Sequence, residues 1–196
     1  MNYNSIKSDV ITKCNPVWDA YRHRECASAG WIKYITDFDK NFDRAYTNHT
    51  RLDLNSHHSL SVLELGSGAG YFAYICKQRH EIMAIDMDPQ KTQGFYAAMR
   101  NALEIPSIIH IIGKPDYLPQ SLHKTSYNAI VAFHATFALN WRIEEWWEFL
   151  PLLYKHLVFN GFIYLEMILP IPDLTSVVSA CGGTVKNNII RITKRV

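Results

Sequence analysis

The chain has 196 residues, of which 48% are apolar, and its formal net charge is +2. This length favours one main domain with a short additional segment, and the apolar fraction is sufficient for one well-filled core. The near-neutral charge argues against the strongly basic surface that holds nucleic acid through counterion release.

The N-terminal residues and the cysteines bear on the compartment. The start, MNYNSIKSDV, is polar and does not resemble a signal peptide, and no apolar run approaches the length of a membrane span. Cys14, Cys26, Cys76 and Cys181 are far apart and lack the paired spacing of a zinc site or a disulfide framework. We therefore expect a cytoplasmic protein with reduced thiols, no bound metal and no membrane partner.

Residues 1–58 show no strand pattern and are expected to form an N-terminal helical cap. The segment 15–46 predicts two helices, with Asn15-Pro16 as the start signal and Gly30 as a break. Residues 48–59 are interpreted as a polar linker. Apolar residues recur at helical spacing and would form one face of the second helix: Trp31, Tyr34, Ile35, Phe38, Phe42 and Tyr46.

That aromatic face has two compatible interpretations. It packs on the main domain, or it covers a ligand site, in which case Tyr34 and Phe38 would contact a substrate.

From Ser61 onward the pattern alternates between strands and helices. Asp88-Pro89 would open the first of these helices, and Asn160-Gly161 would turn the chain into the fifth strand. Asn187-Asn188 would join a C-terminal hairpin through a primed turn. Strands are expected at 62–65, 81–86, 107–112, 129–133, 162–167, 184–186 and 189–194, and helices at 89–103, 143–157 and 173–180. The helix at 143–157 would bury Ile143, Trp146, Trp147, Leu150, Leu153, Tyr154 and Leu157.

Near-continuous apolar strands separated by helices indicate an α/β fold with a doubly wound, mostly parallel sheet of seven strands that ends in an antiparallel hairpin. Residues 59–196 would form this domain, after the cap of residues 1–58. Ligands of such sheets bind beyond the carboxyl ends of the strands. The candidate segments are therefore 66–70, 86–88, 113–117, 134–141 and 166–171.

The segment SVLELGSGAGYFAYI, residues 61–75, combines a buried strand, a glycine loop and the start of a helix. Gly66, Gly68 and Gly70 allow a sharp bend and a close approach of the backbone to a ligand. The helix that follows offers unpaired N–H groups and the positive end of its dipole.

Two carboxylates restrict the identity of this ligand. Glu64 lies inside an apolar strand, where a carboxylate is costly unless a cation or several donors meet it. Asp86 ends the second strand and can accept both hydroxyls of a ribose. An adenosine ligand with a cationic group fits both residues. The alternative is a dinucleotide, because Gly68-x-Gly70-x-x-Ala73 fits the loose NAD fingerprint, but Glu64 would repel a pyrophosphate.

With these residues the sequence resembles the class I S-adenosylmethionine-dependent methyltransferases over roughly residues 60–196. The match consists of VLELGSGAG at 62–70, the acid of AID at 84–86, and LVFNGFIYLE at 157–166, which is similar to the family's turn before its fifth strand. The resemblance implies a Rossmann-like fold and S-adenosyl-L-methionine as the cofactor.

The resemblance also implies roles for individual residues. Glu64 and the loop of residues 66–70 would hold the amino group and the methionine part of the cofactor, Asp86 would bind the ribose, and Met87 would lie against the adenine. The full cofactor-binding set is Glu64, Gly66, Ser67, Gly68, Gly70, Asp86, Met87, Asp116, Tyr117 and Phe133.

The sequence departs from the family pattern at two places. Lys114 stands where an acid that meets the adenine commonly follows glycine, so Asp116 or Tyr117 is the candidate for that contact. Asn128 stands where the family often has aspartate before its fourth strand.

The segment FHATFALNW, residues 133–141, follows the fourth strand and is expected to face the methyl group. His134 is the main candidate for a general base because its ordinary pKa lies near neutrality, and the alternative is a histidine that only lines the pocket. Glu166, at the end of the fifth strand, is the second catalytic candidate, with a structural role as its alternative. Position alone assigns Thr136, Asn140 and Trp141 to the acceptor pocket.

The sequence also argues against nucleic acid as the acceptor. Family members that methylate exocyclic base nitrogens usually carry an Asn/Asp-Pro-Pro-aromatic motif after the fourth strand, where this chain reads AFHA. Base C5 methylation usually uses a Pro-Cys nucleophile there, and no cysteine lies between Cys76 and Cys181.

We therefore expect a small-molecule acceptor that is methylated at oxygen or nitrogen, with an aromatic or partly apolar body, and a monomeric or homodimeric enzyme. A protein or RNA methyltransferase and a non-catalytic S-adenosylmethionine-binding module are the alternatives.

Overall fold

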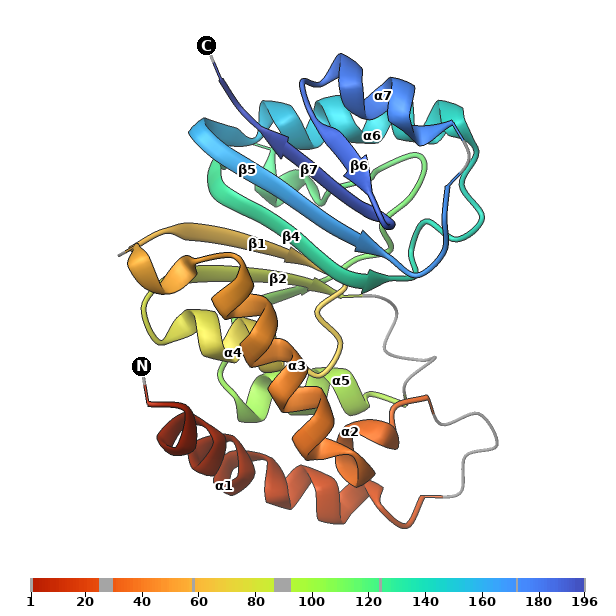
Figure 1. The fold of residues 1–196 in the computed structure, drawn as a ribbon. Helices are drawn as coiled ribbons and strands as arrows, with labels where there is room; N and C mark the ends of the chain where they lie inside the picture. The colour runs from red at the N-terminus through yellow and green to blue at the C-terminus, as the bar shows by residue number, and fades with distance from the viewer. Residues whose placement is uncertain are drawn as a thin grey trace.

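A computed structural model describes residues 2–24, 30–57, 59–86, 93–123, 125–171 and 173–195, and Figure 1 shows their arrangement. Their strands form one sheet in the order β3-β2-β1-β4-β5-β7-β6. β1 to β5 run parallel, whereas β7 is antiparallel to both β5 and β6. The predicted seven-stranded, mostly parallel sheet is confirmed. The strands are β1 Ser61–Leu65, β2 Glu81–Asp86, β3 Ser107–Ile109, β4 Tyr127–Ala135, β5 Leu157–Met167, β6 Thr184–Lys186 and β7 Ile189–Thr193.

Helices cover both faces of the sheet (Figure 1). α1, α3, α4 and α5 share one hydrophobic cluster with one face, and α6 and α7 share a second cluster with the other. Alternation along β1 explains this division, because Val62 contributes to the first cluster and Leu63 and Leu65 to the second. The helices are α1 Tyr3–Tyr21, α2 Lys33–Thr36, α3 Phe38–Arg51, α4 Tyr71–Lys77, α5 Phe95–Ala102, α6 Ile143–Lys155 and α7 Leu174–Ala180, with short 3-10 turns η1 Leu54–Ser56 and η2 Gln120–Leu122.

The first helix begins much earlier than predicted. α1 starts at Tyr3, where the Asn2 side chain accepts hydrogen bonds from the backbone N–H groups of Asn4 and Ser5. The start predicted at Asn15-Pro16 is therefore wrong, and Pro16 lies inside the helix. The helix continues past the proline because a stripe of its side chains is buried and stabilises it. These side chains are Ile6, Val10, Cys14, Trp18 and Tyr21.

The segment 48–59 is not a polar linker throughout. Its first residues complete α3, and Asn48, His49 and Leu54 are buried. The His49 ring packs 6.0 Å from the His80 ring, so polar residues here belong to the interior. The predicted packing of the aromatic face is confirmed by its buried members, Trp31, Phe38 and Phe42.

The division into a cap of residues 1–58 and a domain of residues 59–196 stays a prediction. The buried side chains of α1 and α3 belong to the same hydrophobic cluster as those of α4 and α5.

Several predicted boundaries in the α/β region shift. α5 begins at Phe95, after a turn at Gln93 and Gly94, and the predicted start at Asp88-Pro89 lies outside the described residues. The strand predicted at 107–112 ends at Ile109. Trp147 is 47% exposed although the helical pattern predicted its burial.

The chain does not turn at Asn160-Gly161 before the fifth strand, because β5 already begins at Leu157. Asn160 has a φ of +60°, and a Cβ on Gly161 would lie 2.9 Å from the Val158 carbonyl oxygen. The pair therefore forms an irregularity within β5, beside a register shift against β4. By contrast, the primed turn of the last hairpin is confirmed by positive φ at Asn187 (+50°) and Asn188 (+62°).

Among the helices of the described residues, none combines the length and the apolar character needed to cross a membrane.

Candidate functional site

The glycine loop connects β1 to α4 with three left-handed residues. The φ angles of Gly66, Gly68 and Gly70 are +73°, +53° and +81°, a conformation in which a side chain is strained. The N–H groups of Gly66 and Ser67 both donate to the Ile85 carbonyl oxygen, at 2.8 and 3.1 Å. The loop is thus anchored to the end of β2, which places it at the carboxyl edge of the sheet.

Glu64 is a buried carboxyl group directly before this loop. It is 4% exposed, and its Oε2 atom has no hydrogen-bond partner within the described structure. Burial and then the Asp86 carboxylate raise the pKa of Glu64 to about 8, while the Arg100 guanidinium and a backbone hydrogen bond from Ala73 act in the opposite direction. The Ser67 hydroxyl is also buried and unpartnered among the described residues. Two polar groups here therefore have unused hydrogen-bonding capacity.

Asp86 forms a buried ion pair that the sequence interpretation missed. The Arg100 side chain, from α5, donates through Nη1 to an Asp86 carboxylate oxygen and, at 2.8 Å, to the Gly68 carbonyl oxygen. One guanidinium thus links β2 to the glycine loop. The sequence indicated that a buried Asp86 would need a cationic partner. It did not indicate that Arg100 would be that partner.

A cavity of about 480 Å³ lies at the carboxyl end of β3, lined by Ile109, His110, Ile111, Gly113, Lys114, Pro115 and Asp116. It adjoins the end of β2, because the His110 N–H donates to the Asp86 carbonyl oxygen at 2.8 Å. Asp116 is exposed and lines this cavity. Met87 lies outside the described residues.

The second candidate for the adenine contact, Tyr117, is buried on the α6 side of the sheet, where its hydroxyl donates to Glu148 at 3.0 Å. Trp141 packs against it with 5.3 Å between ring centroids, so the structure brings these two predicted site residues together within an aromatic cluster. Both side chains thus contribute to the core on that face.

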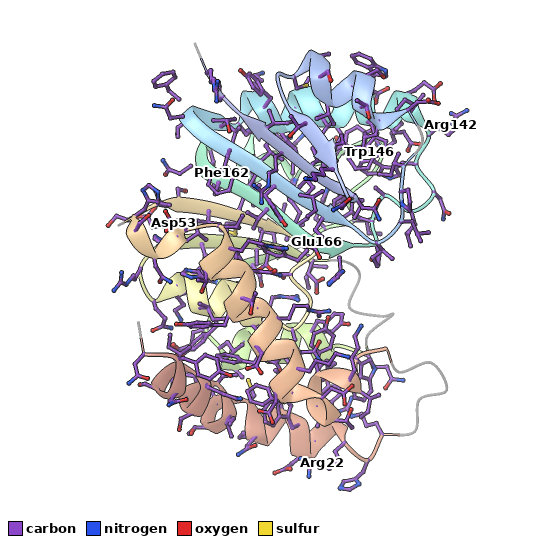
Figure 2. All side chains as sticks on the ribbon, in the orientation of Figure 1. Arg22, Asp53, Arg142, Trp146, Phe162 and Glu166 are labelled. Atoms are coloured by element: carbon purple, nitrogen blue, oxygen red, sulfur yellow. The ribbon has the colours of Figure 1, made fainter. Side chains whose placement is uncertain are left out.

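The two catalytic candidates are neighbours. His134 Nε2 lies 3.4 Å from Glu166 Oε1, and Arg51 Nη2 of α3 donates to Glu166 Oε2 at 2.6 Å. Figure 2 shows Glu166 near the end of β5, between the sheet and the N-terminal helices. His134 has a φ of +50° beside a register shift between β4 and β5, a strained conformation of the kind found at functional sites.

The environment of His134 favours its neutral form. Burial and then the charge of Arg44 lower its pKa, Glu166 acts in the opposite direction, and Lys33 and Arg51 lower it further. Because its pKa is lowered, the imidazole is uncharged at neutral pH, and its free lone pair can accept a proton.

The remaining predicted residues lie in different environments. Phe133 packs between Phe72 and Tyr164, with centroid distances of 4.6 and 5.7 Å. Thr136 and Asn140 are exposed in the segment after β4. Phe38 is buried in the helical layer.

Aromatic side chains flank the glycine loop. The Tyr34 hydroxyl lies 3.5 Å from the position that a Cβ would take at Gly68, and Tyr96 of α5 lies 4.0 Å from it. Phe137, after β4, lies 3.9 Å from the corresponding position at Gly66. Tyr96 and Phe137 were missed from the sequence because their approach to the loop depends on tertiary contacts without a local pattern.

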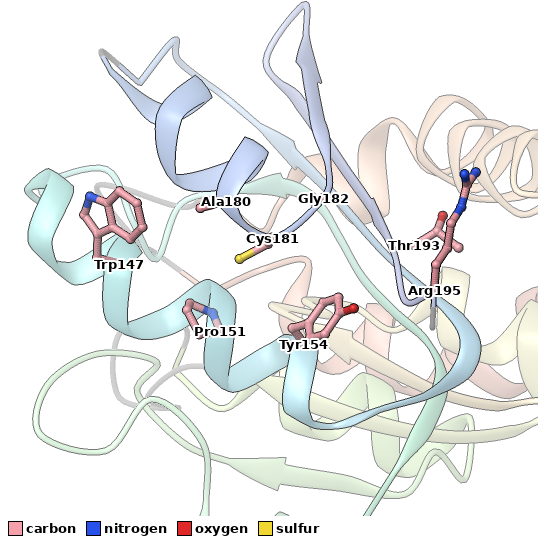
Figure 3. A pocket seen from close by; sticks show the side chains of 8 residues that line it. All are labelled: Trp147, Pro151, Tyr154, Ala180, Cys181, Gly182, Thr193 and Arg195. Atoms are coloured by element: carbon pink, nitrogen blue, oxygen red, sulfur yellow. The ribbon is translucent and has the colours of Figure 1, made fainter.

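A second cavity, of about 550 Å³, lies between α6, the end of α7 and the end of β7 (Figure 3). It contains none of the predicted site residues and is lined by Trp147, Pro151, Tyr154, Ala180, Cys181, Gly182, Thr193 and Arg195. The described part of the chain contains no group of three histidine, cysteine or acidic side chains arranged to hold a metal ion.

No protein-family model and no curated protein matches this sequence. Solved structures of methyltransferases do match its fold. A methyltransferase from Pyrococcus furiosus aligns with a TM-score of 0.56 at 13% identity, over 96% of this chain and 98% of that one. The N-methyltransferase NodS from Bradyrhizobium japonicum aligns with a TM-score of 0.56 at 14% identity, over 81% of this chain and 99% of that one.

A third solved structure contains bound S-adenosylmethionine. This amino pentose methyltransferase of calicheamicin biosynthesis, from Micromonospora echinaspora, aligns with a TM-score of 0.53 at 16% identity. The alignment covers 77% of this chain, which spans 61% of the length of that protein. At these identities the likenesses show the fold alone: the chain has the Rossmann-like fold of the class I methyltransferases.

Proposed function

We propose that this chain, with its class I methyltransferase fold, is an S-adenosylmethionine-dependent methyltransferase that acts on an oxygen or nitrogen atom of a small molecule. The observation that carries the proposal is the unpartnered Glu64 carboxyl oxygen, buried beside three left-handed glycines. A cationic amino group would satisfy that oxygen, and the neighbouring Ser67 hydroxyl offers a second polar contact. A pyrophosphate carries no cationic group that could pair with Glu64.

The strand order supports the same choice. The classic dinucleotide fold has the order 3-2-1-4-5-6, whereas here β7 lies antiparallel between β5 and β6. β1 and β4 are adjacent in the sheet, but the helix that follows β1 lies on one face and the helix that follows β4 lies on the other. Ligands of such sheets bind at this switch point. In the parallel pair of β1 and β4, Glu64 lies opposite Val131. Ser67 and His134 each follow this pair by three residues, so His134 lies at the same edge of the sheet as the glycine loop.

When bound, S-adenosylmethionine supplies an activated methyl group on its sulfonium. Glu64 and the glycine loop would hold its amino acid part, and the cavity beside Asp86 would receive its adenine, with Asp116 at the cavity wall. His134 would accept a proton from the acceptor, and Glu166, held by Arg51, would orient the imidazole and stabilise its charged form. Positioning of the acceptor beside the methyl group would account for much of the rate enhancement.

The binding test uses calorimetry on the intact chain with S-adenosylmethionine and with its demethylated product. We expect one site per chain, a loss of binding on Glu64→Ala, and unchanged binding on Glu81→Ala, which changes an exposed carboxylate of β2. Absence of binding to the intact chain contradicts the proposal.

The catalytic test follows formation of the demethylated cofactor across a panel of small-molecule acceptors. His134→Ala should reduce turnover by about 10²- to 10⁴-fold, the range for a general base, and should leave cofactor binding unchanged. Full turnover of that variant at neutral pH would remove the base assignment.

The second candidate is a non-catalytic S-adenosylmethionine-binding module, which the departures from the family pattern at Lys114 and Asn128 leave open. This second candidate would be selected if the chain binds S-adenosylmethionine, forms no product with any acceptor, and keeps the same cofactor affinity in His134→Ala.

A further inference from the structure

Two arginines of α3 are held by the same local arrangement. Arg44 Nη2 donates to Asn41 Oδ1 at 3.0 Å, and Arg51 Nη2 donates to Asn48 Oδ1 at 2.8 Å. Both asparagines are buried, and they fix the two guanidinium groups. The arginines are seven residues apart, which places them on the same face of the helix, about 10 Å apart along its axis.

The two arginines differ in what neutralises them. Arg51 forms an ion pair with Glu166, whereas Arg44 has no carboxylate partner in the described parts of the chain. The carboxylates of Asp39 and Asp43, also on α3, face α1 and pair with Lys7. Arg44 therefore retains an uncompensated positive charge.

Lys33, on α2, adds a second cation to the same region. Its Nζ lies 5.4 Å from the centroid of the Tyr34 ring, and within the described residues no carboxylate pairs with it. The Lys33 carbonyl oxygen accepts from Asn41 Nδ2 at 2.9 Å, so α2 is tied to the asparagine that holds Arg44. The two cations thus belong to one connected unit.

This unit adjoins the glycine loop through Tyr34, and its Arg44 lies on the same face of α3 as Arg51, whose partner Glu166 neighbours His134. The Tyr34 hydroxyl approaches Gly68, and the charge of Arg44 opposes the rise that burial causes in the pKa of Tyr34. After burial, the charge of Arg44 is also the largest influence that lowers the pKa of His134, and Lys33 acts in the same direction. The positive charges of Arg44 and Lys33 therefore act on His134, and that of Arg44 also acts on Tyr34.

We propose that Arg44, assisted by Lys33, binds an anionic group of the methyl acceptor, a carboxylate or a phosphate. The inference rests on the proposed function and narrows the acceptor to anionic small molecules. A guanidinium can bind either anion through two parallel hydrogen bonds, and the contact with Asn41 holds it in place before the ligand arrives. The anion would then orient the acceptor atom toward His134.

The experiment measures binding of three matched probes to the intact chain saturated with S-adenosylhomocysteine: benzoate, phenyl phosphate and neutral benzamide, at one ionic strength. At least one anion should bind about tenfold or more tightly than benzamide, the factor expected for a charge-assisted hydrogen bond. The tighter of the two anions identifies the group as carboxylate or phosphate.

The variants assign this preference to Arg44. Arg44→Gln should abolish it, and Arg44→Lys should retain part of it because the charge remains. Lys155→Gln, which removes an exposed cation of α6 on the other side of the sheet, should leave it unchanged. Circular dichroism of each variant confirms that it is folded.

Equal affinity for all three probes, or an unchanged preference in Arg44→Gln, overturns the inference. Failure of the proposed function is distinguishable, because it shows as absent binding in the initial titration with S-adenosylhomocysteine. The probes are then titrated into the chain alone, where loss of the anion preference in Arg44→Gln still supports an anion site and its retention removes it.

Discussion

At the scale of single residues, three buried ionisable groups lie at the centre of the proposed site. Glu64 retains an unpartnered oxygen atom, Asp86 is paired, and Arg100 connects Asp86 to the Gly68 carbonyl group. Burial without a paired cation makes a carboxyl group bind its proton more tightly. The pH dependence of stability therefore tests Glu64, and removal of one partner tests the Asp86–Arg100 ion pair.

Glu64 should make the stability of the ligand-free chain fall with rising pH. Its folded-state pKa is raised from 4.5 to about 8, so the folded chain keeps a proton that the unfolded chain releases. The stability that this proton provides is present below about pH 4.5 and is lost as the pH rises through about 8. Glu64→Gln should therefore raise the free energy of unfolding relative to wild type more at pH 8.5 than at pH 5, by an amount on the order of a few kcal/mol.

Urea unfolding at the two pH values measures this difference, with Glu81→Gln as the control for an exposed carboxylate. Parallel pH profiles of wild type and Glu64→Gln would contradict the assignment.

Arg100 and Asp86 should show strong energetic coupling. Arg100→Met leaves the Asp86 carboxylate buried without its guanidinium partner, which should cost roughly 3–5 kcal/mol of unfolding free energy. The double variant with Asp86→Asn removes both charges and should lose less than the sum of the two single variants. Chemical denaturation of the four proteins gives this cycle, and strict additivity would show that the pair is not coupled.

At the scale of elements, the glycine loop depends on contacts with the segment that follows α5. A Cβ on Gly70 would lie 2.6 Å from Ile105 Cδ1 and 3.1 Å from Arg100 Cγ. Because Gly70 precedes α4 and Arg100 belongs to α5, this close approach holds two helices and the loop together. The absence of a side chain at Gly70 is therefore a packing requirement as well as a conformational one.

Gly70→Ala should destabilise the chain more than Gly182→Ala. Both glycines have positive φ, so each substitution introduces backbone strain of roughly 1–2 kcal/mol. Only Gly70 adds overpacking, of roughly 1–3 kcal/mol, because nothing lies within 4 Å of a Cβ at Gly182. Denaturant unfolding of both variants measures the difference, and equal losses would refute the role of the contact with Ile105.

At the scale of the whole molecule, the N-terminal helices and the main sheet share a core. Residues of α1 and α3 lie in the same buried cluster as Val62, Ala84 and Val131 of the sheet. Large hydrophobic contacts between segments make their unfolding cooperative. The predicted cap should therefore unfold together with the sheet as one cooperative unit, with the proposed acceptor site at its inner edge.

Thermal unfolding should be a single transition whose calorimetric and van't Hoff enthalpies agree. Ile6→Ala in α1 and Val177→Ala in α7 should each lower the midpoint of that one transition, and the first should cost roughly 2–5 kcal/mol. Differential scanning calorimetry makes the measurement. Two separate transitions, of which only one responds to Ile6→Ala, would instead establish a cap that unfolds independently.

Features that repeat along the chain, or that a single residue type dictates, were predictable from the local sequence. Apolar runs separated by helical periodicity predicted the parallel sheet, and paired asparagines at 187 and 188 predicted the primed turn. The glycines at 66, 68 and 70, with Glu64 before them, predicted where a ligand would bind. These features depend on local backbone preference and burial, which neighbouring residues express directly.

The contacts between distant residues depend on the tertiary structure. It joined Arg100 to Asp86, Arg51 to Glu166, and Glu166 to His134, and it kept Pro16 inside α1 because that helix buries a long apolar stripe. Such contacts join residues up to 115 positions apart and have no periodic signature in the chain. Their stability comes from burial and charge pairing after the layers have packed, and for that physical reason the local sequence could not predict them.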